Sequence, residues 1–335
     1  MCARCRTLAC GGGGELGGLA AATEGIHVKI HHELARNGHG AALSLAIGFF
    51  DGFHLGHREI IRRCRTIARL GWSVGVLTFS NHPATFLRPG SEPPLIVPLE
   101  ERVNRLAEAG VDELFLVPFD GSIAPLTPDE FVNGVLVRRL GVGAVVVGEN
   151  FRFGAQRAGE LAFLRTSLAP CGVPVEGVTT VTVEGERVSS TRIRREIAKG
   201  HLAPVDAMLG RPYALRGRIC LGEGRGHALG WPTANVEVAE RIVIPKDGVY
   251  EGYARVDGRD YRCLLSIGTK PTFAPQARKA TLEAWLVDFQ GSIYGREIEL
   301  SRLRFLRDQV RFESVEALLR QMEEDAKAVR FPTAF

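Results

Sequence analysis

At 335 residues the chain is long enough for two domains, and its 45% hydrophobic and 24% charged residues are ordinary proportions for a soluble globular protein. No apolar run approaches the roughly 18 residues that a membrane-spanning helix needs, and a net charge of +4 with scattered Lys and Arg residues does not predict nucleic-acid binding. Seven cysteines, an odd number, favour reduced thiols and therefore a cytoplasmic protein.

The first 27 residues differ in composition from the rest of the chain. Three cysteines fall within residues 1–10, and a glycine-rich run follows at residues 11–18. Cys2 and Cys5 have metal-ligand spacing, but no second Cys or His pair stands at the distance that a zinc finger needs. The segment also lacks the apolar core of a signal peptide. We therefore predict a disordered tail over residues 1–27.

From residue 28 onward, apolar runs of strand length alternate with segments of helical period. We predict strands at Leu43–Phe50, Ser73–Phe79, Glu113–Pro118, Ala144–Val147 and Val175–Val183, and helices at His57–Leu70, Leu99–Ala109, Pro128–Leu140 and Glu160–Leu168. Thr127 and Glu130 have the spacing of a capping box at the start of the third helix. The alternation predicts a parallel, Rossmann-like α/β sheet over residues 28–187, with ligands at the carboxyl ends of the strands.

The first strand leads through a glycine-bearing loop into the first helix, and two histidines stand near the start of that helix. His54 and His57 are three residues apart, with Gly56 between them. A helix start offers unpaired N–H groups to a phosphate, and imidazoles add donors that become cationic beside one. The alternative is a surface pair or half a metal site. The strand–glycine–helix context favours phosphate binding.

Polar loops follow two further strands of the predicted sheet. Residues 78–83 read Thr-Phe-Ser-Asn-His-Pro, and residues 148–154 read Gly-Glu-Asn-Phe-Arg-Phe-Gly. Because both follow strand ends, we expect them to meet the histidine loop at one edge of the sheet. Phe151 and Phe153 either wall a pocket or belong to the core, and the core is favoured for at least one of them.

A cluster of hydroxyl and arginine side chains follows the predicted sheet. Ser189, Ser190 and Thr191 precede a helical segment that carries Arg194. N-cap oxygens, free N–H groups and guanidinium groups together make an anion site, and the alternative is a capped surface helix. The helix stops at Gly200, and a second short helix ends at the turn 210–213. We therefore predict a helical linker over residues 188–211.

Residues 212–335 have a different pattern, in which short alternating runs are separated by glycines. The runs are Tyr213–Cys220, Gly248–Val256, Tyr261–Ile267, Thr281–Phe289 and Glu297–Phe305. They predict a small antiparallel β-barrel. A final amphipathic helix, capped by Ser314, should close the chain.

Two segments of this second domain could bind a phosphate and its metal ion. Gly222, Gly224 and Gly226 lie in a glycine-dense loop whose backbone N–H groups can wrap a phosphate, although the string is not a Walker A loop. Thr233 and Asn235 follow on one side of an extended segment and offer oxygen ligands for Mg²⁺. The alternative is a loop that leads into an ordinary strand.

Glu283 interrupts an otherwise apolar strand. It shares a face with Trp285 and Val287, while Leu282, Ala284 and Leu286 take the other face. A carboxylate in this setting is either an edge charge or a base held near a substrate hydroxyl, and spacing alone favours the edge charge.

Several of these strings resemble the signatures of one family. Residues 48–57 read Gly-Phe-Phe-Asp-Gly-Phe-His-Leu-Gly-His, residues 189–194 fit Ser-Ser-Thr-x-x-Arg, and residues 230–235 read Gly-Trp-Pro-Thr-Ala-Asn. In this order they resemble the bacterial bifunctional riboflavin kinase/FMN adenylyltransferases. The family more often has Asn, Val and Phe where Phe49, Phe53 and Trp231 stand, and none of these positions is assigned chemistry.

The resemblance implies a role for each matched residue. In the first domain, His54 and His57 would be catalytic; Gly48, Phe49, Asp51, Gly56, Asn150, Ser189, Ser190, Thr191 and Arg194 would bind the nucleotide; and His82, Pro83, Phe151 and Phe153 would lie on the flavin side. In the second domain, Gly222, Gly224 and Gly226 would bind the nucleotide, Thr233 and Asn235 would hold Mg²⁺ with ATP, and Glu283 would be the base.

Two successive reactions are implied. ATP would phosphorylate riboflavin to FMN in the second domain, and a second ATP would adenylylate FMN to FAD in the first. Riboflavin, FMN and ATP are the expected partners, with no nucleic acid or membrane, and the chain is expected to be a cytoplasmic monomer or weak homo-oligomer. The alternatives are a cytidylyl- or pantetheine-phosphate adenylyltransferase, which lacks the second domain, a flavin-binding regulator without catalysis, and an RNA-binding module.

Overall fold

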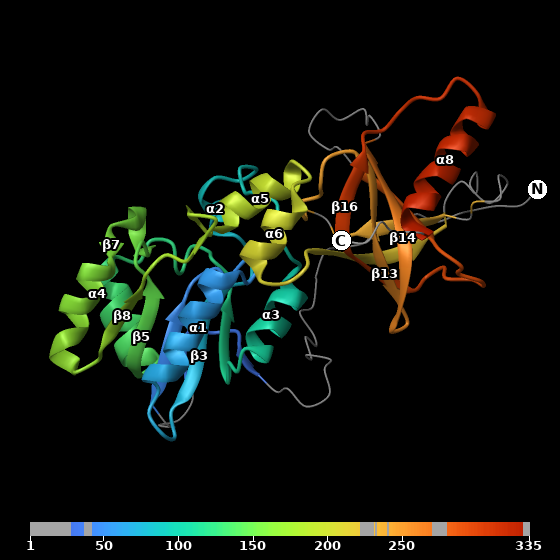
Figure 1. Cartoon of the computed structure of the whole chain (residues 1–335). Coiled ribbons are helices and arrows are strands. Elements are labelled where there is room, and N and C mark those ends of the chain that lie inside the picture. Colours follow the sequence, from blue (N-terminus) through green and yellow to red (C-terminus); the bar gives the residue numbers. More distant parts are fainter. Residues whose placement is uncertain are drawn as a thin grey trace, which may run out of the picture.

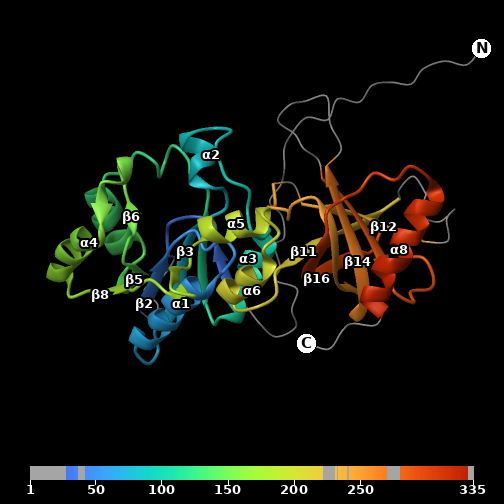
Figure 2. The same ribbon diagram turned by 45° about the horizontal axis from the view of Figure 1, so that its top comes forward.

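The computed structural model describes residues 28–36, 42–221, 231, 233–239, 241–269 and 280–330. A parallel sheet with its helices forms one end of the molecule, a barrel forms the other, and helices α5 and α6 lie between them (Figures 1 and 2). The predicted fold class is thereby confirmed. The predicted tail over residues 1–27 and the loop with Gly222, Gly224 and Gly226 lie outside the described residues.

All strand pairs of the six-stranded sheet are parallel. The strand order is β1 (Lys29–His31), β4 (Glu113–Val117), β3 (Ser73–Phe79), β2 (Leu43–Ile47), β5 (Val142–Gly148) and β8 (Val175–Val178). Leu43, Leu45 and Ile47 of β2 pack on one face, and Ala46 packs on the other. The sheet is therefore covered on both sides, as a parallel sheet requires.

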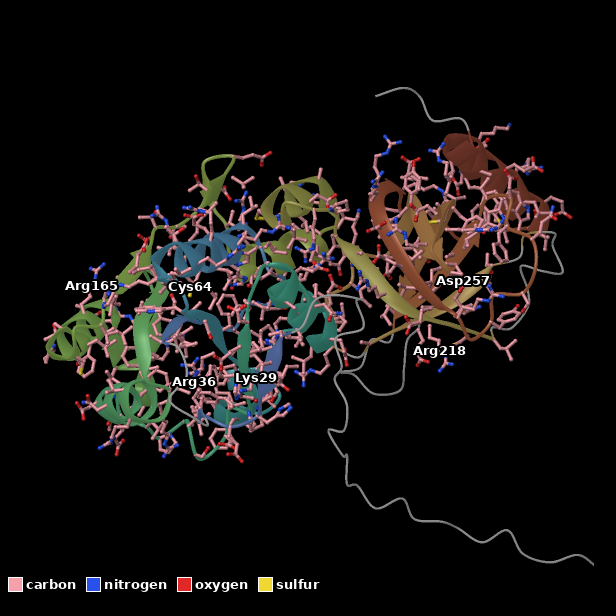
Figure 3. The ribbon with its side chains drawn as sticks, turned by 90° about the horizontal axis from the view of Figure 1, so that it is seen from below. Lys29, Arg36, Cys64, Arg165, Arg218 and Asp257 are labelled. Atoms are coloured by element: carbon pink, nitrogen blue, oxygen red, sulfur yellow. The ribbon has the colours of Figure 1, made fainter. Side chains whose placement is uncertain are left out.

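Two layers of helices cover this sheet. The first consists of α1 (Leu55–Ile67) and α3 (Leu99–Glu108), and Figure 3 shows Cys64 of α1 inside this domain. The second consists of η1 (Glu130–Arg139) and α4 (Leu161–Leu168). The predicted capping box is present, since the Thr127 amide donates to Glu130 Oε2 at 2.9 Å and the Glu130 amide donates to Thr127 Oγ1 at 3.2 Å. The helix that follows is a π-helix, which the sequence did not predict.

The predicted strand Val175–Val183 is correct at its start and wrong in its length. Strand β8 ends at Val178, and β9 (Thr182–Val183) pairs instead with β10 (Glu186–Arg187) in a small hairpin. The carboxylate of Glu149 accepts the Thr180 amide at 3.0 Å and so takes a donor that a continuing strand would need.

Several short elements were also missed, because they are too short for a periodic pattern. They are β1, α2 (Pro83–Leu87), β6 (Arg152–Phe153), η2 (Ala155–Arg157), β7 (Gly159–Glu160) and η3 (Ala169–Cys171).

The second domain is a closed barrel of antiparallel strands, as predicted. The strand order is β11 (Ala214–Cys220), β12 (Ala234–Val238), β15 (Ala280–Leu286), β14 (Arg259–Thr269), β13 (Gly248–Val256) and β16 (Glu297–Arg307). Helix α8 (Val315–Arg330) packs outside the barrel, where Ala326 and Val329 contact Val249, Leu264 and Trp285. Its predicted cap is present, since the Ala317 amide donates to Ser314 Oγ at 3.2 Å.

The region predicted as a linker is packed into the core of the barrel domain. Helices α5 (Ser190–Ala198) and α6 (Leu202–Leu209) bury Ile193, Ile197 and Met208 in one hydrophobic cluster with the barrel interior. That cluster also contains Ile96 and Val97 of the α/β domain.

Main-chain hydrogen bonds join the two domains beside this cluster. The Leu95 amide donates to the Arg241 carbonyl at 2.7 Å, and the Val243 amide donates to the Leu95 carbonyl at 2.8 Å.

No helix in the part of the chain that the structure describes is long and apolar enough to cross a membrane.

A barrel fragment should need the two junction helices. We expect residues 188–335 to unfold at a higher temperature than residues 212–335, because the shorter fragment loses the buried side chains of Ile193, Ile197, Val205 and Met208. Each such side chain contributes about 1.5–3 kcal/mol when fully buried. Thermal unfolding followed by circular dichroism would measure the difference, and equal midpoints would show that the helices do not support the barrel.

Candidate active sites

The loop between β2 and α1 has an unusual backbone. Phe50 (φ 57°), Gly52 (φ 76°) and Phe53 (φ 41°) all adopt positive φ angles. Such a conformation costs a non-glycine residue about 1–3 kcal/mol and persists only where the surroundings enforce it. Both phenylalanine side chains are buried, and a Cβ atom on Gly52 would lie 2.9 Å from Ile96 Cδ1. The loop is therefore held in a strained shape, as is common at functional sites.

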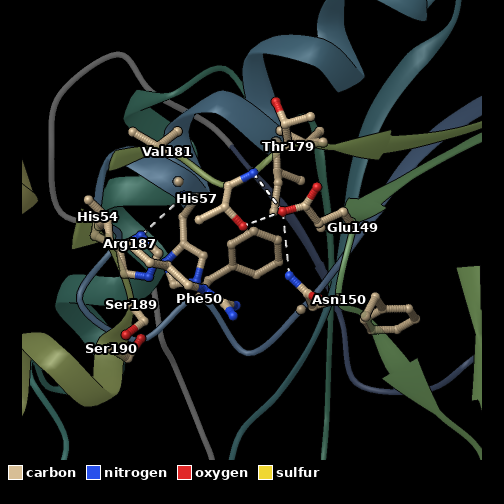
Figure 4. Close-up of a pocket in the computed structure, with 18 of the residues that line it drawn as sticks. Phe50, His54, His57, Glu149, Asn150, Thr179, Val181, Arg187, Ser189 and Ser190 are labelled. Atoms are coloured by element: carbon tan, nitrogen blue, oxygen red, sulfur yellow. Dashed lines mark hydrogen bonds between the residues drawn. The ribbon is translucent and has the colours of Figure 1, made fainter. Parts of the chain in front are cut away.

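His54 and His57 lie against each other at the start of α1. His54 is the N-cap, and its Nδ1 accepts the His57 amide at 3.3 Å. The two rings stack with centroids 3.6 Å apart and an interplanar angle of 16° (Figure 4). Nδ1 of His57 is buried and has no hydrogen-bond partner in the protein. A buried polar atom left in this state is a sign of a binding site.

Burial keeps both imidazoles neutral. It lowers the pKa of His54 to about 3, with the charges of Arg187 and Arg211 adding to the effect. Burial also lowers the pKa of His57 well below its ordinary value, and the neighbouring His54 lowers it further. The expectation that the imidazoles become cationic concerns a bound phosphate and stays a prediction.

A pocket of about 300 Å³ joins three of the predicted segments. The histidine loop, the loop after β5 and the serine segment before α5 all line it, as Figure 4 shows. The predicted site residues in its lining are Gly48, His54, Gly56, His57, Asn150, Phe151, Ser189 and Ser190. The structure thus brings the two segments that were predicted to bind phosphate to one cavity at the carboxyl edge of the sheet.

Hydrogen bonds also tie the serine segment to the histidine loop. Ser190 Oγ donates to the Asp51 carbonyl at 3.0 Å, and Arg194 Nη2 donates to Asp51 Oδ2 at 2.6 Å. Ser189 caps α5 by accepting the Arg192 amide at 3.2 Å. Of the predicted nucleotide-binding residues that the structure describes, Phe49, Asp51, Thr191 and Arg194 do not line the cavity itself.

Some lining residues were not singled out from the sequence. Thr179 lies inside the predicted strand Val175–Val183, and Arg187 belongs to β10, which the sequence does not predict. Glu149 lies in the loop 148–154, whose sequence predicts a binding loop. No sequence pattern indicates that its carboxylate accepts the Thr180 amide. The position of Arg187 just before the serine segment is the sequence feature that could have indicated its place in the pocket lining.

Of the four predicted flavin-side residues, Phe151 lines the pocket, whereas His82, Pro83 and Phe153 do not. His82 caps α2, where its Nδ1 accepts the Ala84 amide at 3.1 Å, and its ring meets Phe49 edge-on with centroids 4.8 Å apart. Phe151 lines the pocket and stacks on Phe153 with centroids 5.6 Å apart. Phe153 is 7% exposed and belongs to the core, so the core interpretation is correct for that residue. Pro83 begins α2.

The buried histidines should make the protein sensitive to acid. The unfolded chain takes up protons at these residues as the pH falls below 6.5, whereas folded His54 does not until about pH 3. The free energy of unfolding should therefore fall over that range, by about 1.4 kcal/mol per pH unit for each such histidine.

Urea unfolding at pH 7.5 and pH 5.5 would measure this loss. His54→Asn should show a smaller pH dependence than the parent chain. An unchanged dependence in that variant would contradict the assignment of the effect to the imidazole.

A second cleft, of about 360 Å³, lies between the outer face of the barrel and α8. Thr233, Ser266 and Glu283 line it, together with Trp231, Trp285 and residues of α8 such as Met322. The cross-strand register places Glu283 opposite Asn235 on β12 and opposite Ser266 on β14. A carboxylate, an amide and a hydroxyl therefore form one row across three strands.

The predicted faces of β15 are confirmed. Leu282, Ala284 and Leu286 point into the barrel core, whereas Trp285 packs toward α8. Glu283 therefore lies on the cleft side and is not a charge at a free sheet edge, because β15 is paired on both sides.

Polar contacts hold the walls of this cleft in place. Arg307 donates from Nη2 to Asp325 Oδ2 at 2.6 Å and from Nε to Asp325 Oδ1 at 3.0 Å, which fixes α8 to the end of β16. Gln309 Nε2 donates to Ser266 Oγ at 3.2 Å. Trp231 and Trp285 lie with ring centroids 4.7 Å apart.

Comparison with known proteins assigns both halves of the chain. Residues 37–192 match the FAD synthetase family model, and residues 209–331 match the riboflavin kinase model. A bifunctional riboflavin kinase/FMN adenylyltransferase of Listeria monocytogenes is 36% identical over 85% of this chain and 91% of its own length. The chain belongs to the bifunctional riboflavin kinase/FMN adenylyltransferase family.

Further relatives extend this result. The enzymes of the same name from Escherichia coli and Bacillus subtilis are 35% and 32% identical, over 91% and 97% of their own lengths. A crystal structure titled as a macrolide-efflux protein from Streptococcus pneumoniae superposes with a TM-score of 0.82 at 30% identity, covering 91% of this chain and 99% of that one. The pocket at His54 thus lies in the FAD synthetase domain and the cleft at Glu283 in the riboflavin kinase domain.

Proposed function

We propose that the pocket at His54 and His57 binds the triphosphate of ATP and transfers its adenylyl group to FMN. The observation that carries this assignment is the meeting of two capped helix starts, at His54 of α1 and Ser189 of α5, in the lining of one cavity. Unpaired N–H groups and partial positive charge at two helix starts favour a polyanion. The buried Nδ1 of His57 and Nε of Arg194 lack protein partners and are further groups for phosphate oxygens.

Catalysis at this site should consist of positioning and charge stabilisation. The phosphate of FMN is already ionised at neutral pH, so it can attack the α-phosphate of ATP without a protein base. Pyrophosphate then leaves, and the new bond completes FAD. His54, His57, Ser190 and Arg194 would stabilise the negative charge that moves onto the leaving group.

The flavin would approach from the side of α2 and the loop after β5. His82 and Pro83 start α2, and Phe151 supplies an apolar wall to the pocket. Asn150 lines the same cavity, where its amide can bind the nucleotide. Phe153 would support Phe151 from the core by stacking on it.

In the riboflavin kinase domain, Glu283 would accept the proton of the terminal ribityl hydroxyl as that oxygen attacks the γ-phosphate of ATP. Its place between Asn235 and Ser266, in a cleft with apolar walls, supports this role. The tryptophan pair Trp231 and Trp285 offers aromatic surface for the flavin ring.

The oxygen donors of this domain suit Mg²⁺ that arrives with ATP. Thr233 lines the cleft and Asn235 lies opposite Glu283, so both would hold the ion, which would neutralise charge on the transferring phosphate. Within the described residues no group of three or more His, Cys, Asp or Glu side chains could hold a metal ion alone. This donor set fits an ion whose remaining ligands come from water and ATP oxygens.

We further propose that the enzyme works in the cytoplasm as a monomer or weak homo-oligomer. The described cysteines Cys64, Cys171, Cys220 and Cys263 are all free thiols, which suits a reducing compartment. Light scattering over a range of protein concentrations would measure the oligomeric state.

Product analysis tests the proposed activities directly. The purified chain should convert riboflavin, ATP and Mg²⁺ first to FMN and then to FAD, which chromatography separates. Replacing ATP by CTP should give no dinucleotide product. A cytidylyl product would favour the related transferases instead, and binding without turnover would favour a regulator.

A further inference from the structure

The carboxylate of Asp51 has all its hydrogen bonds inside the protein. The residue is 1% exposed and does not line the nucleotide pocket. Oδ1 accepts the Ile96 amide at 3.0 Å and the Val97 amide at 3.4 Å, while Oδ2 accepts from Arg194 at 2.6 Å. These contacts leave it no direct role in holding a nucleotide.

The amides that hold this carboxylate are themselves fixed from the barrel side. Ile96 and Val97 are 0% and 4% exposed and belong to the hydrophobic cluster that contains the barrel interior. Leu95, just before them, exchanges main-chain hydrogen bonds with Arg241 and Val243. Asp51 is therefore anchored to a part of the junction that cannot shift without disturbing the core.

Arg194 is tied to the protein by this carboxylate and keeps other N–H groups for a ligand. Its Nε is buried and has no protein partner. Burial is the largest cause of the lowered pKa of His54 and of His82, and the positive charge of Arg194 lowers both pKa values further. The guanidinium therefore lies near a residue proposed for the nucleotide side and near one proposed for the flavin side. A guanidinium with one end fixed has fewer orientations to lose when phosphate binds.

We propose that Asp51 is a positioning residue for adenylyl transfer, whose buried carboxylate, anchored on the amides of Ile96 and Val97, aims the guanidinium of Arg194 at the phosphates. The inference rests on the proposed role of Arg194 in that reaction. In the transition state, negative charge develops on the leaving pyrophosphate. The stabilisation that the guanidinium provides therefore depends on its orientation toward these oxygens more than on its charge alone.

The test measures kcat and KM for FAD formation, with riboflavin kinase activity of the same chain as the measure of intact protein. Asp51→Asn should keep an oxygen for the amides but lose the ion pair. We expect kcat for adenylyl transfer to fall by about 10- to 100-fold with unchanged kinase activity. The matched control is Glu113→Gln at the start of β4, which removes another buried carboxylate, paired with Arg36 at 2.6 Å, and should leave both activities unchanged.

A double-mutant cycle separates positioning from a general structural role. Arg194→Gln should lower kcat, and adding Asp51→Asn to it should cost little more, because the carboxylate then has no guanidinium to aim. Full additivity of the two losses, or an equal loss in Glu113→Gln, would overturn the proposal. A normal rate in Arg194→Gln would instead overturn the assigned role of Arg194.

A second variant covers the case in which Asp51→Asn does not fold. Asp51→Glu keeps the charge but displaces the guanidinium by the length of one methylene group. It should retain kinase activity and lose adenylyl transfer, whereas wild-type rates for both would contradict the proposal.

Discussion

FAD formation should fall by a hundredfold or more in His57→Ala, while FMN formation from riboflavin continues at its normal rate. His57 lines the proposed nucleotide pocket, stacks on His54 and carries a buried nitrogen without a protein partner. Removing one preorganised donor to a developing anion typically costs about 10²–10³ in rate. Chromatography of flavins formed from riboflavin and from FMN would measure the two steps separately.

A second histidine of the same domain serves as the control. His31 is also a partly buried imidazole stacked on an aromatic ring, Phe115, at 4.6 Å, but it lies on the edge strand β1 outside the pocket. His31→Ala should leave FAD formation near normal. If His57→Ala reduced both FMN and FAD formation equally, the assignment of separate sites to the two domains would be wrong.

The opposite selectivity is expected for Glu283→Ala. Riboflavin phosphorylation should fall by about 10²–10⁴-fold, the usual contribution of a general base, while FAD formation from supplied FMN is spared. We expect this selectivity because Glu283 lies on the cleft face of β15, between Asn235 and Ser266 on the neighbouring strands. Initial rates with riboflavin and with FMN as the starting flavin would be compared.

Glu297→Gln provides the matching control, since Glu297 is an exposed glutamate on β16, another barrel strand. It should phosphorylate riboflavin at the parent rate. Unimpaired kinase activity in Glu283→Ala would refute its role as the base and return it to a structural one.

Local patterns predicted the parts of the fold that depend on neighbouring residues. The alternation of apolar residues along β15 predicted which side chains point into the barrel core and which point outward. It therefore predicted that Glu283 lies on the outer face with Trp285, where the structure shows the cleft. Capping residues such as Thr127 and Ser314 were identified because a cap is a contact over three residues. The carboxyl edge of the parallel sheet predicted that the histidine loop and the loop after β5 would meet, and both line the pocket. The family resemblance, and not the sheet, implied that Ser190 would join them.

Contacts between distant segments were not visible in the same way. The apolar and β-branched run at residues 175–183 looks like one strand, and only the capture of the Thr180 amide by Glu149 ends it. Arg187 stands after that run, in β10, and its place in the pocket lining is not predicted by any local pattern. Asp51 was predicted to bind the nucleotide, but its amide partners stand 45 and 46 residues later in the chain, and no local pattern marks them.

The cluster that contains Ile96, Ile193 and Tyr250 draws on both domains and on the helices between them. Loosening any one of these segments exposes apolar surface that belongs to the others, so the unfolding of one lobe should lower the melting temperature of its neighbour. Warming that unfolds the α/β lobe would then also reduce the stability of the barrel, on which the formation of FMN depends.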